Sequence, residues 1–442
     1  MGTRFGTDGI RGAVGTEVTV ELALALGRAV GHRMGGTGRT VVLGRDTRRS
    51  GEMLSAALAA GLTATGTDVV DLGVVTTPCL VHASGSEPFA AGIMVSASHN
   101  PAPDNGLKVV VGGRKVDDAV EDALEALIDD PAAIPGLPNE TLGRVRPDRG
   151  SVDAYRRHLV EAAGDAFVGL QLGIDCANGS ASVIAPDLLR SIGAEVTVLF
   201  DAPDGTNIND GCGSTHPERL AETVAAAGLD LGLAFDGDAD RLIAVDARGE
   251  LVDGDAVMGI CALDRLAAGT LRNNLLVTTV MSNGGLERAV MQAGGRMVRT
   301  PVGDRHVFEA MEREDAVIGG EQSGHIIFRD LTTTGDGLLT GIELVRAMRA
   351  AGVSLADLAG RIPRLPQVML NSAVRRGAEW RADAEFSTAV DRAIEQMGDR
   401  GRVLVRPSGT EPKIRIMVEG DDAGEIDRIA RELATLAEAR LN

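Results

Sequence analysis

The sequence predicts an α/β protein made of three similar α/β domains followed by a smaller C-terminal α+β domain. A strand–turn–helix–strand pattern occurs three times along the chain. With 442 residues the chain is too long for one compact core. It also holds 57 glycines, which suit many tight turns between strands and helices. Aromatic residues make up only 2%, so the cores must be built from Ala, Val, Leu and Ile.

The repeated unit begins with a strand that ends in a short polar turn, and the first of these strands, 40–44, is β-branched. The three units comprise strand 40–44, helix 51–61 and strand 68–72; strand 170–176, helix 183–192 and strand 195–200; and strand 275–281, helix 286–292 and strand 296–300. A glycine follows each helix, at Gly66, at Gly193 and at Gly294 or Gly295. Glycine in this place is typical of a helix C-terminus. The pattern therefore predicts three βαβ-like units of one architecture.

Linkers rich in proline, glycine and polar residues separate these units. They divide the chain into domains over residues 1–150, 151–252, 253–365 and 366–442. In the last domain we expect strands at 367–374, 402–405 and 414–419 and an amphipathic helix at 423–441. The apolar face of that helix carries Ile426, Ile429, Leu433 and Leu436.

The charge balance limits the partners. Lys and Arg number 44 and Asp and Glu 63, a net charge of −19, which argues against a nucleic-acid partner. No apolar run approaches the roughly 18 residues of a membrane span, and the N-terminus has no apolar signal region. The four cysteines are far apart and without a C-x-x-C motif. We therefore expect a cytoplasmic protein with free thiols and no membrane partner.

The stretch 92–108, G-I-M-V-S-A-S-H-N-P-A-P-D-N-G-L-K, carries candidate nucleophilic chemistry. An apolar strand ends at Ser96, and two prolines prevent it from continuing. Loops at the carboxyl ends of strands are where open α/β sheets bind ligands. Ser98 offers a hydroxyl nucleophile, and His99 and Lys108 offer proton transfer. An ordinary Asn-Pro turn with a capping serine fits the local sequence equally well.

The stretch 234–241, A-F-D-G-D-A-D-R, predicts a metal site. Asp236, Asp238 and Asp240 alternate with small residues, and their carboxylates would repel one another without a hard cation. Ligation by oxygen alone suits Mg²⁺. The alternative is a solvated acidic turn, but apolar strands at 231–235 and 242–245 hold this loop at the end of a sheet.

Two further loops carry polar groups suited to a sugar phosphate. In G-G-E-Q-S-G-H, 319–325, Glu321 and Ser323 could bind sugar hydroxyls and His325 could transfer a proton. A polar hairpin loop with a structural histidine is as good an interpretation. In R-P-S-G-T-E-P-K-I-R, 406–415, the sequence predicts an anion nest rather than a solvated loop. Its members are Arg406, Ser408, Thr410 and the Gly409 amide.

Three other segments are weaker signals when taken alone. They are R-F-G-T-D-G-I-R-G at 4–12, in which Arg11 could contact an anion, G-R-D-T-R-R-S at 44–50 and T-P-V-G-D-R at 300–305.

Taken together, the serine, acidic, sugar and anion loops resemble those of the α-D-phosphohexomutase superfamily, in the same order and one in each domain. Within it, F-G-T-D-G-I-R-G at 5–12, G-T-N-I-N at 205–209, C-G-S-T-H-P at 212–217 and G-E-Q-S-G-H at 320–325 are similar to the branch that acts on amino sugars. The resemblance spans the chain and implies mixed sheets in the three α/β domains, with the four domains around a central cleft.

The resemblance also assigns roles to individual residues. It implies that Ser98 is phosphorylated and that the Ser98 phosphate joins Asp236, Asp238 and Asp240 as Mg²⁺ ligands. Lys108 and His325 would be the general acid and base, which leaves His99 to shape the loop. Arg241 and Arg11 would hold substrate or phosphoserine, and Glu321, Ser323 and His325 would bind the sugar. The non-reacting phosphate would be bound by Arg406, Ser408, Gly409, Thr410 and Arg415. Arg305 matches less closely.

The implied activity is an intramolecular phosphotransfer of the isomerase class. Phospho-Ser98 would donate to O1 of glucosamine 6-phosphate, and the resulting 1,6-bisphosphate would turn over and return its 6-phosphate to Ser98. The resemblance further implies one Mg²⁺ per subunit, activation by glucose or glucosamine 1,6-bisphosphate, a homodimer, and a role in supplying UDP-N-acetylglucosamine and cell-wall precursors.

Three alternatives stay open. A phosphomannomutase/phosphoglucomutase of the same superfamily would share every catalytic loop and differ in the sugar. A haloacid-dehalogenase-type phosphatase would use Asp236 as its nucleophile. A sugar-phosphate sensor on the same fold would bind without turnover, although Ser98, the three aspartates and Lys108 argue against it.

Overall fold

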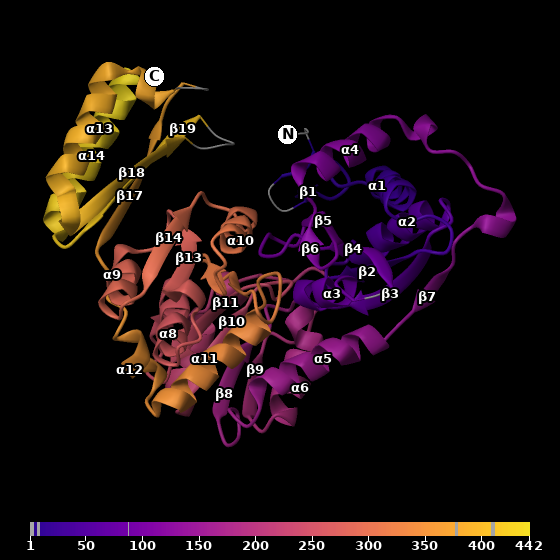
Figure 1. The fold of residues 1–442 in the computed structure, drawn as a ribbon, viewed down its shortest axis with the longest axis horizontal. Coiled ribbons are helices and arrows are strands. Elements are labelled where there is room, and N and C mark those ends of the chain that lie inside the picture. The colour runs from indigo at the N-terminus through magenta and orange to yellow at the C-terminus, as the bar shows by residue number, and fades with distance from the viewer. Residues whose placement is uncertain (1–3, 7–8, 87, 376–378, 408–411) are drawn as a thin grey trace. The chain divides into compact units, whose positions relative to one another are not determined.

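The computed structural model describes residues 4–6, 9–86, 88–375, 379–407 and 412–442, whose strands form four sheets (Figure 1). The chain divides into two units. The first unit holds residues 1–281 and 293–361 with three of the sheets, and the second holds residues 282–292 and 362–442 with the fourth.

The first sheet has the strand order β1-β5-β4-β2-β3-β7, with β6 paired to β5. Strands β2, β3 and β4 are parallel, whereas β5 runs antiparallel to both β4 and β1. Helices α1 and α2 lie side by side against it (Figure 1). Its strands are β1 (Ile10–Ala13), β2 (Thr40–Arg45), β3 (Asp68–Val74), β4 (Phe89–Val95), β5 (Asp104–Val111), β6 (Arg114–Lys115) and β7 (Val145–Pro147). Its helices are α1 (Val20–Arg33), α2 (Gly51–Thr63), α3 (Thr77–Ser84) and α4 (Asp118–Asp129).

The second sheet has the order β12-β11-β10-β8-β9. Strands β10 and β11 form an antiparallel hairpin, and the acidic loop is its turn. The strands are β8 (Gln171–Asp175), β9 (Glu195–Leu199), β10 (Leu231–Phe235), β11 (Leu242–Asp246) and β12 (Leu251–Val252). The helices are α5 (Gly150–Ala163), α6 (Ala185–Ser191) and α7 (Glu218–Ala227).

The third sheet, β14-β13-β15-β16, completes the first unit. Strands β15 and β16 form a second hairpin, whose turn is the predicted sugar loop. The strands are β13 (Leu275–Thr279), β14 (Arg296–Thr300), β15 (Ile318–Gly320) and β16 (Ile326–Phe328). The helices are α8 (Gly254–Ala267), α10 (Asp304–Arg313), α11 (Gly337–Ala351) and α12 (Leu355–Ala359).

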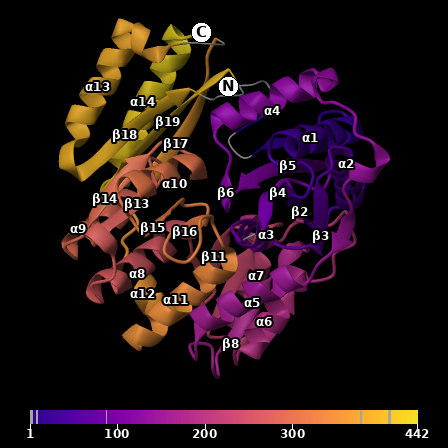
Figure 2. The ribbon, with the colours of Figure 1, turned by 45° about the vertical axis from the view of Figure 1, so that its right-hand side comes forward.

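The second unit is an antiparallel sheet of order β17-β19-β18 with α13 and α14 on one of its faces (Figures 1 and 2). Its elements are α9 (Gly284–Gln292), β17 (Gln367–Ala373), α13 (Ala384–Met397), β18 (Gly401–Pro407), β19 (Lys413–Gly420) and α14 (Ala423–Arg440). Ile426, Ile429 and Leu433 of α14 are buried, as the apolar periodicity predicts.

The structure confirms the α/β class and the mixed sheets, and it differs from the sequence expectations in detail. The expected helix 183–192 is a 3-10 turn at 180–183 followed by the short helix α6. Helix α13 is not among the predicted elements. The glycines after the three predicted helices have φ of 80°, 99° and 88° at Gly66, Gly193 and Gly294. These left-handed conformations are the reason that glycine occupies the three positions.

The expectations about the cysteines and about membrane-spanning segments can also be compared with the structure. Cys79, Cys176, Cys212 and Cys261 are all buried and free. Among the described residues, no helix is both long enough and apolar enough to cross a membrane.

Candidate active site

The loop after β4 holds Ser98 in an unusual backbone conformation. Its φ is +51°, in the left-handed region that non-glycine residues seldom occupy. The Ser98 amide donates to Ser96 Oγ at 2.9 Å, and the Ser98 hydroxyl donates a short hydrogen bond to Asp236 Oδ2. Ser98 is 1% exposed. The serine loop thus aims its hydroxyl at the acidic loop of the next domain.

Arg48 holds this loop from behind. Its guanidinium is fully buried and donates to the carbonyl oxygens of Ser98 at 3.0 Å, Asn100 at 2.7 Å and Asp104 at 3.0 Å. Its Nε is paired with Asp46 Oδ2 at 2.9 Å, so the buried charge is neutralised. The planar fork of arginine suits several carbonyls at once. Arg48 therefore fixes the backbone on which Ser98 is placed.

Asn209, in the second domain, binds the same backbone. Its amide donates to the carbonyl oxygens of Ser98 at 2.9 Å and Asn100 at 3.0 Å. Neither Arg48 nor Asn209 was among the site residues expected from the sequence. The segments that contain them, 44–50 and 205–209, were noted there, but their roles depend on contacts between distant segments.

The acidic loop brings its three carboxylates together as predicted. Ligand oxygens of Asp236, Asp238 and Asp240 lie within 4.8 Å of one another, and the three side chains are buried. Lys108 Nζ lies 2.7 Å from Asp238 Oδ2 and 3.7 Å from Asp240 Oδ2. Thr77, at the start of α3, donates to Asp238 Oδ2 at 2.6 Å.

Burial and mutual repulsion act unequally on these carboxyls. Burial, together with Asp240 and Asp238, raises the pKa of Asp236 well above its usual range. Burial also raises the pKa of Asp238, but Lys108 and Thr77 outweigh it and hold that pKa far below its usual range. Such opposed shifts are typical of a functional site.

The donor set fits a hard cation. Among the described residues, Asp238 Oδ1 and Asp240 Oδ1 are buried without a hydrogen-bond partner. Buried carboxylate oxygens left without hydrogen bonds are costly unless an ion occupies the space between them. Three carboxylates with no nitrogen or sulfur ligand match the preference of Mg²⁺ and Ca²⁺. The acidic loop could therefore hold a metal ion.

Further cationic groups surround the triad. Arg241 Nε lies 4.0 Å from Asp236 Oδ2 and 3.9 Å from Asp240 Oδ1. Burial lowers the pKa of Arg241, but Asp240 and Asp236 reverse the shift and raise it. Burial also lowers the pKa of Arg11 on β1, and the neighbouring Asp238 opposes that shift. The structure thus brings Ser98, the triad, Lys108, Arg241 and Arg11 into one site.

His99 is close to the nucleophile but carries little positive charge. Its Nδ1 lies 3.4 Å from Ser98 Oγ. Burial, with Arg241 and Arg11 nearby, lowers the pKa of His99 to about 4. A neutral imidazole in this position agrees with a loop-shaping role.

The predicted sugar loop is a hairpin turn with one end at the triad. The Glu321 carboxylate accepts from the Gly303 amide at 3.1 Å, while Ser323 is exposed. His325 is 4% exposed, and its Nε2 lies 4.0 Å from Asp240 Oδ2. The local structure is thus the hairpin of the alternative interpretation, and its histidine still lies beside the acidic loop.

The predicted phosphate loop belongs to the second unit. Ser408, Gly409 and Thr410 lie outside the described residues. Arg406 on β18 and Arg415 on β19 are directly opposed in the antiparallel register. Burial and the charge of Arg415 lower the pKa of Arg406. Two like charges side by side on a sheet repel each other, and an anion would relieve that repulsion.

The comparisons with known proteins assign the class. The phosphoglucomutase/phosphomannomutase family matches in four blocks: α/β/α domain I over residues 2–133, domain II over 153–249, domain III over 253–365 and the C-terminal domain over 369–436. Together these blocks span nearly the whole chain, so the protein belongs to this family, in the α-D-phosphohexomutase superfamily. It is an enzyme of the isomerase class, a mutase.

Individual members of the family show which enzymes this chain is similar to. The chain is 52% identical to the phosphoglucosamine mutase of Symbiobacterium thermophilum, with all of both chains covered. It is 49% identical to the phosphoglucosamine mutase of Mycobacterium marinum, over 99% of this chain and all of that one. Among solved structures, a phosphoglucomutase/phosphomannomutase family protein from Burkholderia thailandensis matches with a TM-score of 0.83 at 29% identity, covering 100% of this chain and 99% of that one.

Proposed function

We propose that this enzyme interconverts glucosamine 6-phosphate and glucosamine 1-phosphate through a phosphorylated Ser98 and a 1,6-bisphosphate intermediate. One observation carries the proposal. The Ser98 hydroxyl is hydrogen-bonded to one of three clustered carboxylates, and Lys108 and His325 approach the same cluster. The sugar is inferred from the two phosphoglucosamine mutases that are about half identical to this chain over their full length.

The site residues suit phosphoryl transfer, which depends mainly on positioning and charge neutralisation. Ser98 would carry the phosphoryl group. Arg241 and Arg11 would bind its oxygens, since both are held beside the triad by acidic neighbours. Arg48 and Asn209 would keep the Ser98 backbone in place during both half-reactions.

Asp236, Asp238, Asp240 and phosphorylated Ser98 would hold Mg²⁺. When bound, the ion would neutralise phosphate charge and the charge that develops during transfer. The buried Oδ1 atoms of Asp238 and Asp240, which have no hydrogen-bond partner in the described part of the chain, support this assignment.

Lys108 and His325 would take and return the sugar hydroxyl protons in the two halves of the reaction. Lys108 reaches the triad from β5, and His325 reaches it from the sugar loop. Glu321 and Ser323 would bind the sugar hydroxyls. The phosphate that does not react would be bound by Arg406, Ser408, Gly409, Thr410 and Arg415.

The remaining proposals concern the cellular setting. Activation by glucose or glucosamine 1,6-bisphosphate would keep Ser98 phosphorylated. Four buried free cysteines support a reducing, cytoplasmic location. The enzyme would form a homodimer, which light scattering can measure. It would supply amino sugar for UDP-N-acetylglucosamine and peptidoglycan precursors.

A coupled assay for glucosamine 1-phosphate, with Mg²⁺ and catalytic 1,6-bisphosphate, tests the function. We expect turnover by the unmodified enzyme and none by Ser98→Ala, and an inactive enzyme or an active variant would refute the proposal. Comparing kcat/KM for glucosamine, mannose and glucose 6-phosphates separates it from a phosphomannomutase/phosphoglucomutase. Labelled phosphate on Asp236, with full activity in Ser98→Ala, would instead indicate a phosphatase.

A further inference from the structure

The segment 300–305, T-P-V-G-D-R, has no role in the proposed function. Its Gly303 amide binds the Glu321 carboxylate, and its next two residues begin helix α10. Both of those residues turn to the first domain. Asp304 pairs with Lys115 on β6, and Arg305 pairs with Glu121 on α4 at 2.8 Å. The segment therefore joins the third domain to the first beside the active site.

Asp304 also contacts His325. Its Oδ2 lies 3.6 Å from His325 Nε2, and both side chains are largely buried. The same His325 nitrogen lies 4.0 Å from Asp240 Oδ2. The imidazole is thus held between a carboxylate of the acidic loop and a carboxylate at the start of α10.

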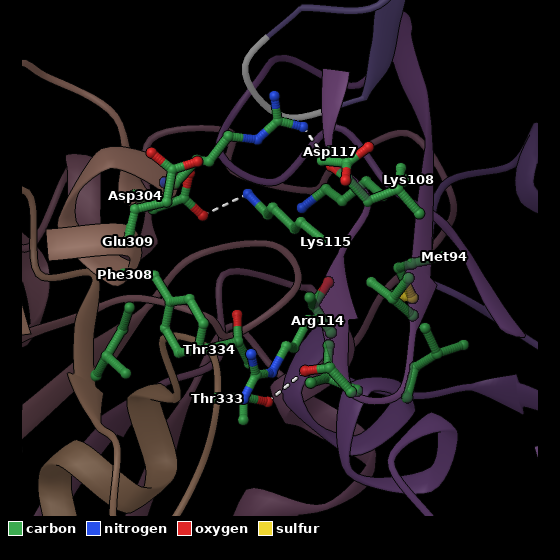
Figure 3. Close-up of a pocket in the computed structure, with 18 of the residues that line it drawn as sticks. Met94, Lys108, Arg114, Lys115, Asp117, Asp304, Phe308, Glu309, Thr333 and Thr334 are labelled. Carbon is green, nitrogen blue, oxygen red and sulfur yellow. Dashed lines mark hydrogen bonds and ion pairs between the residues drawn. The ribbon is translucent and has the colours of Figure 1, made fainter. Parts of the chain in front are cut away.

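Lys115 makes it possible to bury this second carboxylate. Burial raises the pKa of Asp304, but Lys115 and His325 outweigh it and hold that pKa well below its usual range. Asp304 is therefore an anion beside His325. Figure 3 shows Lys115 reaching Asp304 across the space between the two domains, next to Lys108.

Lys108 and Lys115 come from one hairpin. Strands β5 and β6 are joined by Gly112 and Gly113, and Lys115 is paired with Val110. Val110 and Lys108 are two residues apart on β5, so the two lysines share a face of the sheet. Lys108 contacts Asp238 and Asp240, and Lys115 contacts Asp304. The β5–β6 hairpin thus carries Lys108 itself and contacts His325 through Asp304.

Two further contacts join the hairpin to the third domain. Arg114 pairs with Glu312 of α10 at 2.6 Å, and the Thr333 hydroxyl donates to the Gly113 carbonyl. These groups line the cavity of about 290 Å³ in Figure 3, whose wall also includes Lys108 and Phe308. The Arg114–Glu312 and Lys115–Asp304 ion pairs thus both link the hairpin to α10.

We infer that Asp304 is a positioning residue for His325: held by Lys115, it fixes the imidazole for proton transfer to and from the sugar. A carboxylate that orients a histidine is a recurring arrangement: it occurs at proton-transfer sites, and at metal-ligating histidines its loss typically costs about 10- to 100-fold in affinity or activity. The inference rests on the proposed proton-transfer role of His325.

The test is a double-mutant cycle in the coupled assay, with Mg²⁺ and bisphosphate saturating. Asp304→Asn should lower kcat at least about 10-fold with KM changed by less than about 3-fold. Asp304→Glu should recover part of that loss. In a His325→Asn background, Asp304→Asn should cost nothing more, because the group on which it acts is gone.

Glu312→Gln is the matched control, since it breaks an ion pair at the same junction without touching His325. It should leave kcat unchanged, and melting temperatures of all variants report loss of folding. The inference is overturned if His325→Asn is impaired while Asp304→Asn keeps its kcat, or if Asp304→Asn costs as much in both backgrounds. An unimpaired His325→Asn would refute the proposed role of His325 and this inference together. If Asp304→Asn fails to fold, Asp304→Glu takes its place. A kcat loss in Asp304→Glu that persists in the His325→Asn background overturns the inference. A loss that vanishes in that background supports it.

Discussion

The serine loop and the acidic loop face each other at the site but are completed by different means. The serine loop is held by the protein itself: Arg48 and Asn209 bind its carbonyl oxygens, and Asp46 neutralises Arg48. The acidic loop keeps buried oxygens of Asp238 and Asp240 without a hydrogen-bond partner among the described residues. The serine loop is thus held by groups of the chain itself, whereas the acidic loop could hold a metal ion at its clustered carboxylates. At the contact between the two loops, the serine loop thus contributes a rigid backbone and the acidic loop contributes negative charge.

Ser98→Ala should give the largest effect, because the serine loop would keep its shape and lose only the phosphate carrier. We expect kcat to fall by about 10³-fold or more. The coupled assay measures this, and incubation with labelled bisphosphate shows whether phosphate is retained. Ser86→Ala, at an exposed serine of the same domain, is the control. Retained label on the Ser98→Ala protein would place the phosphate on another residue.

Removing a charge from the acidic loop should abolish its response to metal. Mg²⁺ at 100 times its Kd should stabilise the unmodified protein by about 2.7 kcal/mol. Asp240→Asn should lose most of that gain, because one of the oxygen ligands becomes a neutral amide. Melting temperatures with and without Mg²⁺ measure the difference. An equal Mg²⁺ shift in the two proteins would mean that the ion binds elsewhere.

Arg48→Lys should separate position from charge in the serine loop. Lysine keeps the charge beside Asp46 but cannot reach several carbonyl oxygens at once. We expect kcat to fall about 10²-fold, since small displacements of a reacting group are that costly. The control is Arg49→Lys at the exposed neighbouring residue. Normal kcat in a folded Arg48→Lys protein would show that Asn209 alone suffices.

His99→Asn should have the smallest effect on catalysis, with kcat within about 3-fold, because loss of a general base costs far more. The effect of this substitution should appear instead in the stability of the folded protein at acid pH. Burial holds the folded pKa of His99 at about 4, whereas the unfolded chain takes up the proton near pH 6.5. The unmodified protein therefore loses stability as pH falls from about 6.5 to about 4.

The His99→Asn variant lacks this titration, so its melting temperature should fall less over that range. Measuring both proteins from pH 7 to pH 4 in the same salt checks the sign. A steeper fall in the variant would mean that His99 is protonated in the folded protein.

The comparison of these loops also shows how much of the fold and the site can be predicted from the sequence. Strands β2, β8 and β13 were predictable because each is a largely apolar run that ends at a short polar turn. The triad was predictable because its three aspartates sit in one turn, where repulsion can be inferred from spacing alone. Helix α13 was not predicted, although it buries Phe386 and Val390 against the last sheet.

Arg48 and Asp304 were missed for a different reason. The carbonyl oxygens that Arg48 binds lie about fifty residues along the chain, and Lys115, the lysine that pairs with Asp304, lies 189 residues away. Only the parallel pairing of β2 with β4 places residue 48 behind the serine loop. A polar segment directly after a strand next to β4 was the available signal, since both strands end at one sheet edge.

The left-handed backbone of Ser98 has a consequence for how this protein can be improved. An L-residue in that conformation costs on the order of 1 kcal/mol, which Ser98→Gly would recover while removing the hydroxyl and its hydrogen bond to Asp236. The position of greatest use to the reaction is thus one where the sequence is not optimal for stability. A screen for heat tolerance alone does not test for the hydroxyl at this position, so screens for robust variants need activity as a second criterion.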